Sequence, residues 1–98
     1  MKPYEAMKRR VHVFYAGRVQ GVGFRVTVEE VALAHGVVGC VKNLKDGRVE
    51  LVAEGEEAKL ETFLEAIQYG PMKNFIKSIE LTWGNATDVF DEFEIRYY

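Results

Sequence analysis

Hydrophobic and polar residues alternate in several short stretches of the chain and follow a helical period in two longer ones. Alternating or wholly apolar stretches are typical of β-strands, because successive side chains of a strand point to opposite faces of the sheet. The strands predicted in this way cover residues 11–16, 37–43, 48–54, 77–83 and 93–97. The first stretch is apolar on both faces, which indicates a central strand, and we expect the short last stretch at an edge of the sheet.

Two stretches place their apolar residues on one helical face. In the first, which begins at Phe24 and stops at Gly36, the residues that recur at helical spacing are Phe24, Val28, Val31, Ala32 and His35. In the second, which Glu56 and Glu57 open and Gly70-Pro71 ends, they are Leu60, Phe63, Leu64 and Ile67. Acidic residues favour the start of a helix, and glycine and proline favour its end. The pattern therefore predicts two amphipathic helices.

The predicted elements follow the order β-α-β-β-α-β, with a short fifth strand at the end. This is the order of the ferredoxin-like split βαβ fold, an α+β architecture. Asp46-Gly47 is a strong signal for a hairpin between the second and third strands. Both helices must cover one face of an antiparallel sheet to bury their apolar stripes. We expect one domain over residues 11–98, preceded by a loosely ordered N-terminal arm over residues 1–10.

Composition and charge argue against several classes of protein. Hydrophobic residues make up 48% of the 98 residues, enough for a packed core, and a net charge of −2 gives no broad basic field for nucleic acid. Cys40 is the one cysteine, so an intrachain disulfide is excluded and we expect a cytoplasmic protein. No apolar run approaches the roughly 20 residues of a membrane span. We therefore expect neither a nucleic-acid partner nor a membrane.

The segment GRVQGVGFR, from Gly17 to Arg25, joins the first predicted strand to the first predicted helix. Its glycines allow consecutive backbone N–H groups to point into one hollow, and the start of the helix adds unpaired donors. Such a hollow binds a phosphate, and the guanidinium of Arg25 can hold two of its oxygens. The amides expected to bind are those of Val19, Gln20, Gly21, Val22, Gly23, Phe24 and Arg25.

Other known phosphate and metal motifs are not found. A dinucleotide-binding fingerprint would need a third glycine where this chain has Val26, and no Gly-Lys-Ser/Thr of a Walker loop occurs. No pair of histidines has the spacing of a zinc protease, and no cluster of acidic ligands accompanies the loop. The sequence therefore predicts a phosphate site without a metal ion.

A second segment, GCVKNLKDGRVE at residues 39–50, follows the glycine loop. Together the two segments closely resemble the acylphosphatase family, whose pattern is G-x-V-Q-G-V-x-F-R and then G-x-V-x-N-x-x-D-G-x-V-E. The closing FEIRYY and Gly70-Pro71 are also similar to that family, so the resemblance covers roughly Val11 to Tyr97. Two positions depart from it: Gly23 replaces a frequent aromatic residue, and Cys40 a frequent tryptophan.

The resemblance implies a small monomeric hydrolase that cleaves acyl phosphates to a carboxylate and inorganic phosphate. Arg25 would hold the phosphoryl group and stabilise its charge, and Asn43 would orient the attacking water. Asn43 ends the second predicted strand, and in a split βαβ order the first and second strands can end at the same edge, so Asn43 could face the loop. The implied partner is a small acyl phosphate, with inorganic phosphate or sulfate as a competing anion, and no cofactor is implied.

Two other functions stay open at this point. The first is a non-enzymatic regulatory domain that binds an anion on a ferredoxin-like frame, since a fold alone does not imply an activity. The second is a carbamoyl-phosphate-processing module like that of the hydrogenase maturation factors. Release of phosphate from benzoyl phosphate would distinguish an enzyme from a regulatory domain.

Overall fold

A computed structural model of the chain describes residues 7–97. Its elements are β1 (Lys8–Gly17), α1 (Phe24–His35), β2 (Val38–Asn43), β3 (Val49–Glu56), α2 (Glu57–Gln68), the short 3₁₀ helix η1 (Lys73–Phe75), β4 (Ile76–Asn85) and β5 (Phe93–Arg96). Each strand and each longer helix was predicted from the sequence, whereas η1 was not. Within these residues no helix is long and apolar enough to cross a membrane.

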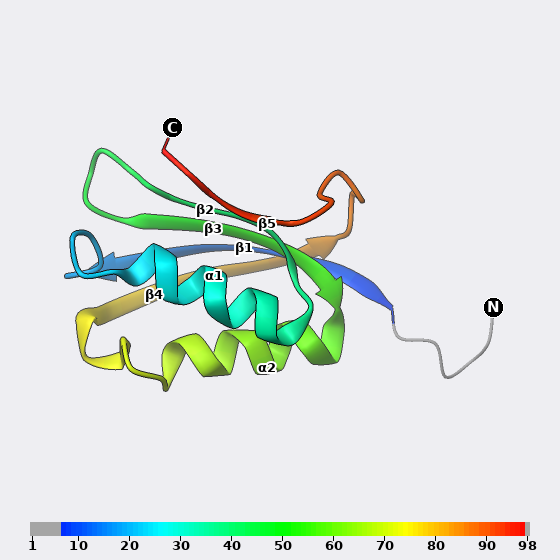
Figure 1. The fold of residues 1–98 in the computed structure, drawn as a ribbon, viewed down its shortest axis with the longest axis horizontal. Helices are drawn as coiled ribbons and strands as arrows, with labels where there is room; N and C mark the ends of the chain where they lie inside the picture. The colour runs from blue at the N-terminus through cyan, green and yellow to red at the C-terminus, as the bar shows by residue number, and fades with distance from the viewer. Residues whose placement is uncertain (1–6, 98) are drawn as a thin grey trace.

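The strands form one sheet in the order β4-β1-β3-β2-β5 (Figure 1). The pairs β4–β1, β1–β3 and β3–β2 are antiparallel, and β5 runs parallel to β2. The predicted ferredoxin-like α+β fold is confirmed, although the sheet is mixed rather than wholly antiparallel. The reason is that the chain crosses from β4 at one edge to the other edge, where β5 lies beside β2 and runs in the same direction.

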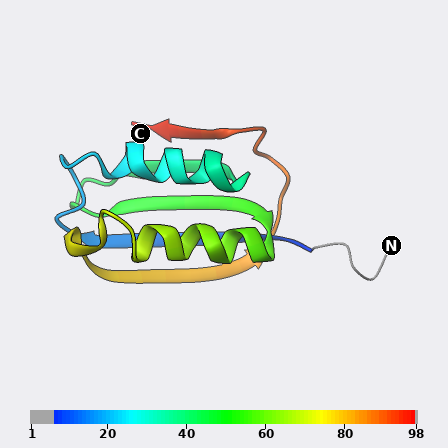
Figure 2. The same ribbon diagram turned by 60° about the horizontal axis from the view of Figure 1, so that its bottom comes forward.

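Both helices lie on one face of the sheet (Figure 2). α1 packs over β2 and β5, and α2 packs over β3 and β1. The core between the two layers takes every second residue of β1, since Val11, Val13 and Tyr15 are at most 1% exposed. From the helices it takes Phe24, Val28, Ala32, Leu60, Phe63 and Ile67. These are residues of the two predicted helical stripes, so the hydrophobic period identified the buried faces correctly.

The predicted N-terminal arm is wrong for residues 8–10, which form the beginning of β1. Arg9 forms an ion pair with Glu57 at 2.9 Å, and Arg10 forms one with Glu54 at 2.9 Å. Their partners lie on β3 and α2, far away in the sequence, so no local pattern indicated these contacts. The rest of the predicted arm, residues 1–6, lies outside the described residues.

Gly39 explains how β2 fits against β3. A Cβ atom at this position would lie 2.0 Å from the carbonyl oxygen of Val52, and the φ angle of Gly39 is +146°. No side chain can occupy that space, because real Cβ atoms do not approach a backbone oxygen so closely. The glycine at the head of the second sequence motif therefore allows the strand that ends at Asn43 to form.

Three segments meet at one end of the sheet. β1 and β2 both pair antiparallel with β3, so they run in the same direction and stop at the same end of the sheet, as the sequence predicted. β5 is parallel to β2 and also ends there. The glycine loop after β1, the turn between β2 and β3, and the segment after β5 are thereby gathered at this end (Figure 1).

Candidate functional site

The glycine loop crosses this end of the molecule from η1, just before β4, to the β2–β3 turn. At its beginning, the amide of Arg18 donates a hydrogen bond to the carbonyl of Phe75, at 2.9 Å. Further along, the side-chain amide of Gln20 donates to the carbonyls of Leu44 and Arg48, at 2.7 and 2.9 Å. The loop is thus attached to η1 at one side and to the β2–β3 turn at the other.

The side chains of Val19 and Phe24 anchor the loop in the core, where each is 1% exposed. The ring of Phe24 packs edge-on against the ring of Tyr15, with the centroids 5.1 Å apart. Between the two anchors the backbone turns at Gly21 and Gly23, whose φ angles are +75° and +80°. Left-handed residues that alternate with right-handed ones turn successive N–H groups toward one side, the geometry of an anion nest.

The amides of this segment have no other use in the fold. Within the part of the chain that the structure describes, those from Val19 to Gly23 donate no hydrogen bond to another residue. The first backbone bond of α1 runs from the amide of Thr27 to the carbonyl of Gly23, at 3.1 Å, so the amides before Thr27 have no acceptor within the helix. Free donors at a helix start attract an anion.

Arg25 lies in the first turn of α1, and its guanidinium lies over the ring of Tyr97, 5.0 Å from the centroid. No acidic group of residues 7–97 lies within 4.0 Å of it. A cation on an aromatic face keeps its N–H donors in the ring-parallel plane free for another partner. Arg25 is therefore oriented without being neutralised, and it can bind an anion.

Asn43 is the last residue of β2 and lies opposite Val49 in the sheet. Strand alternation places it on the same face as buried Val41, the face that carries the helices. Its Oδ1 atom is buried and has no hydrogen-bond partner among residues 7–97. The residue also lines a shallow hollow together with Lys42, Leu44, Lys45 and Tyr97. A group that enters this hollow meets an acceptor that the protein leaves unused.

Asp46 holds the β2–β3 turn beside the loop. Its carboxylate accepts hydrogen bonds from the backbone amide of Arg48 at 3.0 Å and from the guanidinium of Arg48 at 2.8 Å. The backbone bond first and the side-chain bond second lower the pKa of Asp46 below its ordinary value. Within the turn, the backbone amide of Leu44 donates a hydrogen bond to the carbonyl of Arg48 at 2.8 Å. These bonds support the structural role that the sequence gave Asp46-Gly47.

Tyr97 brings the two predicted catalytic residues to one place, because Arg25 stacks on its ring and Asn43 shares its hollow. The sequence alone did not identify Tyr97 or the side chain of Gln20 as parts of the site. The alternation of residues 93–97 was the available signal for Tyr97, since it puts this ring on the face of Phe93 and Ile95. For Gln20 no signal existed, because its acceptors are backbone carbonyls.

Cys40 lies on the opposite face of β2 from Asn43, by the same alternation. It is 8% exposed, and burial raises the pKa of its thiol. The departure from the family's tryptophan therefore lies away from the site. No three histidine, cysteine or acidic residues among residues 7–97 gather into a group that could hold a metal ion.

Comparison with known proteins gives consistent matches over nearly the whole chain. A family model described as Acylphosphatase matches residues 11–95. A protein named acylphosphatase from Synechococcus sp. is 52% identical over 87 residues, which cover 89% of this chain and 92% of that protein. The crystal structure of acylphosphatase from Bacillus subtilis superposes with a TM-score of 0.84 at 38% identity and covers 91% of this chain and 99% of its own.

The fold also occurs within longer proteins. The crystal structure of HypF from T. kodakarensis matches with a TM-score of 0.77 at 33% identity over 92% of this chain, but only 12% of the longer chain is covered. The relatives that this chain matches over most of their own length carry the name acylphosphatase.

Proposed function

The chain belongs to the acylphosphatase family and hydrolyses acyl phosphates, and on that premise we propose that Arg25, Asn43 and the loop amides of residues 19–25 carry out the reaction. The substrate is a small molecule with a carboxyl–phosphate bond. Of the alternatives that the sequence left open, a non-enzymatic regulatory domain does not agree with the named relatives. The proposal therefore concerns how the site works.

The loop amides and Arg25 hold the phosphoryl group. The donors that lack acceptors surround one nest at the start of α1, and the guanidinium of Arg25 faces no acid. Phosphoryl transfer depends mainly on positioning and on stabilising charge at the three non-bridging oxygens. Backbone donors fixed by buried Val19 and Phe24 need no reorganisation when that charge develops.

Asn43 orients the water, and one observation carries this part of the proposal: its Oδ1 is a buried acceptor without a partner in the part of the chain that the structure describes. Leaving such a group unsatisfied costs about 1–3 kcal/mol, so a fold without a use for it would replace or pair it. A water that donates one hydrogen to Oδ1 directs a lone pair away from Asn43 and toward the phosphorus held by the loop.

The reaction then balances without a strong base. The water oxygen forms a bond to phosphorus while the bond between phosphorus and the carboxyl oxygen breaks, and the leaving carboxylate keeps that electron pair. A carboxylate is a good leaving group, so it needs no proton from an acid. The amide of Asn43 is a poor base, and a phosphoryl oxygen of the substrate accepts the proton of the water. The products are a carboxylate and inorganic phosphate.

Two substitutions separate binding from catalysis. Asn43→Ala is expected to lower kcat for benzoyl phosphate roughly 100- to 1000-fold, the range found when one catalytic amide is removed, with little change in inhibition by inorganic phosphate. Arg25→Ala is expected to lower kcat and also to weaken inhibition by inorganic phosphate. Asn85→Ala, an exposed residue of β4 at the other end of the sheet, is the matched control. Near wild-type kcat in Asn43→Ala would show that Asn43 does not position the water.

The remaining expectations extend the proposal. Inorganic phosphate and sulfate compete with the substrate, the enzyme works as a cytoplasmic monomer, and no metal ion, cofactor or nucleic acid takes part. Turnover measured with and without a chelator tests the absence of a metal ion. Light scattering across a range of protein concentrations tests the monomer, and a mass that rises with concentration would contradict it.

A further inference from the structure

Charges are unevenly distributed along the sheet. Among residues 7–97, seven of the lysines and arginines lie within 4.0 Å of an acidic group. The others, which have no such partner among these residues, are Arg18, Arg25, Lys45, Lys73 and Lys77. All five belong to the end where the site lies: the glycine loop, the start of α1, the β2–β3 turn, η1 and the start of β4. Although the chain has a net charge of −2, the cations of residues 7–97 without an acidic partner thus lie beside the site.

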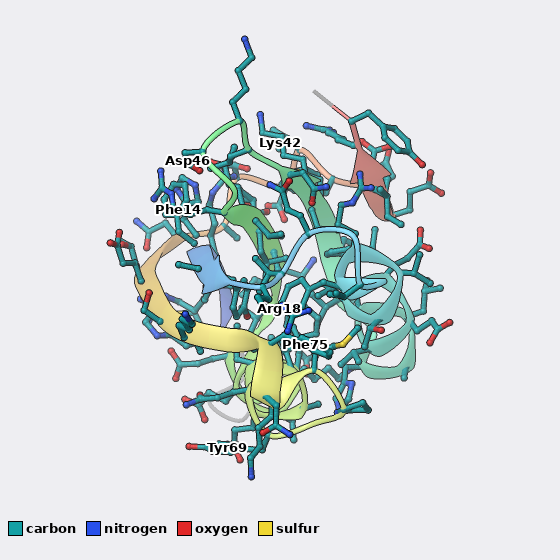
Figure 3. The ribbon with its side chains drawn as sticks, turned by 90° about the vertical axis from the view of Figure 1, so that its left-hand side faces the viewer. Phe14, Arg18, Lys42, Asp46, Tyr69 and Phe75 are labelled. Atoms are coloured by element: carbon teal, nitrogen blue, oxygen red, sulfur yellow. The ribbon has the colours of Figure 1, made fainter. Side chains whose placement is uncertain are left out.

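The unpaired cations include residues on both sides of the loop. Arg18 belongs to the β4 side, where its amide is bonded to the carbonyl of Phe75. Asn43 and Lys45 belong to the β2 side. β1 and β3 separate β4 from β2 in the sheet. Figure 3 looks at this end and shows Arg18 on the Phe75 side of the loop, whereas Lys42, the neighbour of Asn43, lies on the opposite side.

The geometry of in-line displacement relates the Asn43 side of the loop to the Arg18 side. The attacking and leaving oxygens lie on opposite sides of the phosphorus. If Asn43 directs the water from the β2 side, the acyl group must leave on the side away from Asn43. The loop residue with an exposed charge on that side is Arg18, and beyond it lie Lys73 in η1 and Lys77 at the start of β4.

We propose that this site selects acyl phosphates whose acyl group carries a second negative charge, and that Arg18 is the specificity-determining residue that binds this charge. The inference rests on the proposed function, because it takes the side of attack from Asn43. An exposed arginine with no acidic group of residues 7–97 within 4.0 Å does not lose an ion pair when it binds a carboxylate, and its planar fork suits carboxylate and phosphate groups. Lys73 and Lys77 add a more diffuse attraction.

Two substrates that differ in one substituent test the proposal: benzoyl phosphate and 4-carboxybenzoyl phosphate. The quantity to compare is the ratio of their kcat/KM values, because intrinsic reactivity cancels when the ratio in a variant is divided by that in the wild type. Arg18→Gln is expected to lower the ratio about fivefold, the upper range for a partly exposed ion pair, and to change hydrolysis of benzoyl phosphate much less. Arg18→Lys should keep part of the preference, since it retains the charge and loses the fork.

Lys45→Gln is the matched control, since it removes one unpaired cation from the β2 side of the same end. It is expected to leave the ratio unchanged. An unchanged ratio in Arg18→Gln, or an equal fall in Lys45→Gln, would overturn the role of Arg18 while leaving the proposed function intact. If the wild-type protein releases phosphate from neither compound, the proposed function itself fails and this inference fails with it.

Discussion

At the scale of single residues, the side chain of Gln20 decides whether the glycine loop and the β2–β3 turn stay together. Its amide group donates to two carbonyls, and each carbonyl keeps one backbone donor besides. Gln20→Ala is expected to lower the free energy of unfolding by about 1–2 kcal/mol, from the loss of two partly buried hydrogen bonds. It should also weaken inhibition by inorganic phosphate, because the loop amides lose their support. Urea denaturation and inhibition assays measure the two effects.

Gln20→Glu provides the sharper comparison. Glutamate has the same length but offers only acceptors, so its carboxylate would face the carbonyls of Leu44 and Arg48 without a proton to share. At neutral pH this variant should be less stable than Gln20→Ala. Equal stability of the two variants would mean that the hydrogen bonds of Gln20 contribute little.

The sequence predicted the location of Arg25 and Asn43 better than it predicted their surroundings. The glycine spacing and the strand order were enough to predict that both residues lie at the same end of the sheet. The unpaired Oδ1 of Asn43, the ring of Tyr97 beneath Arg25 and the clamp of Gln20 depend on atoms from separate segments. Such contacts have no periodicity along the chain, so only the folded arrangement shows them.

At the scale of elements, helix bounds were easier to predict than strand bounds. α1 covers Phe24–His35 as the period indicated, and Gly36 ends it in a left-handed conformation with a φ of +66°. β3 instead continues through Gly55 to Glu56, past the predicted end at Glu54. A lone glycine does not end a strand whose partner continues, and here Arg9 of β1 lies opposite Gly55. The pairing of β3 with β1 therefore determined where the strand ends, rather than the local preference of Gly55.

The segment that joins β4 to β5 depends on one buried carboxylate. Glu54 is 3% exposed, and it accepts hydrogen bonds from the amides of Thr87 and Asp88, from the Thr87 hydroxyl and from Arg10. Burial raises the pKa of Glu54, but the bonds from Thr87, Asp88 and Arg10 outweigh it, so the pKa lies below the ordinary value. The ionised form of Glu54 therefore stabilises the fold.

This gives a stability prediction with a definite sign. A carboxyl group with a lowered pKa in the folded state contributes stability above its unfolded pKa, about 4.3, and loses it as the pH falls through the folded value. The free energy of unfolding should therefore decrease between about pH 5 and pH 3. In Glu54→Gln that decrease should be smaller, and stability at pH 7 should fall by roughly 2 kcal/mol. Parallel pH profiles in wild type and Glu54→Gln would contradict the assignment to Glu54.

At the scale of the whole molecule, the cations of residues 7–97 that have no acidic group within 4.0 Å gather at the site end, so we expect a positive field there although the net charge is −2. The ion pairs of Lys8 with Asp88 and Lys59 with Glu56 hold cations at the other end. Loops that are separate in sequence contribute the unpaired charges, so composition alone predicted only the absence of a broad basic field. The fold collects these charges at the one edge where three chain segments meet.

Such a field should draw acyl phosphates toward the site, and salt should weaken the effect. Salt shortens the range of electrostatic attraction to about 10 Å near 0.1 M. We therefore expect kcat/KM for benzoyl phosphate to fall roughly threefold to tenfold between about 20 and 300 mM salt, with kcat nearly constant. A double variant of Lys45→Gln and Lys73→Gln should flatten this slope. Lys8→Gln with Lys59→Gln removes the same charge from acid-paired positions at the other end and should leave the slope unchanged. Equal slopes in both double variants would mean that net charge, rather than its position, governs substrate capture.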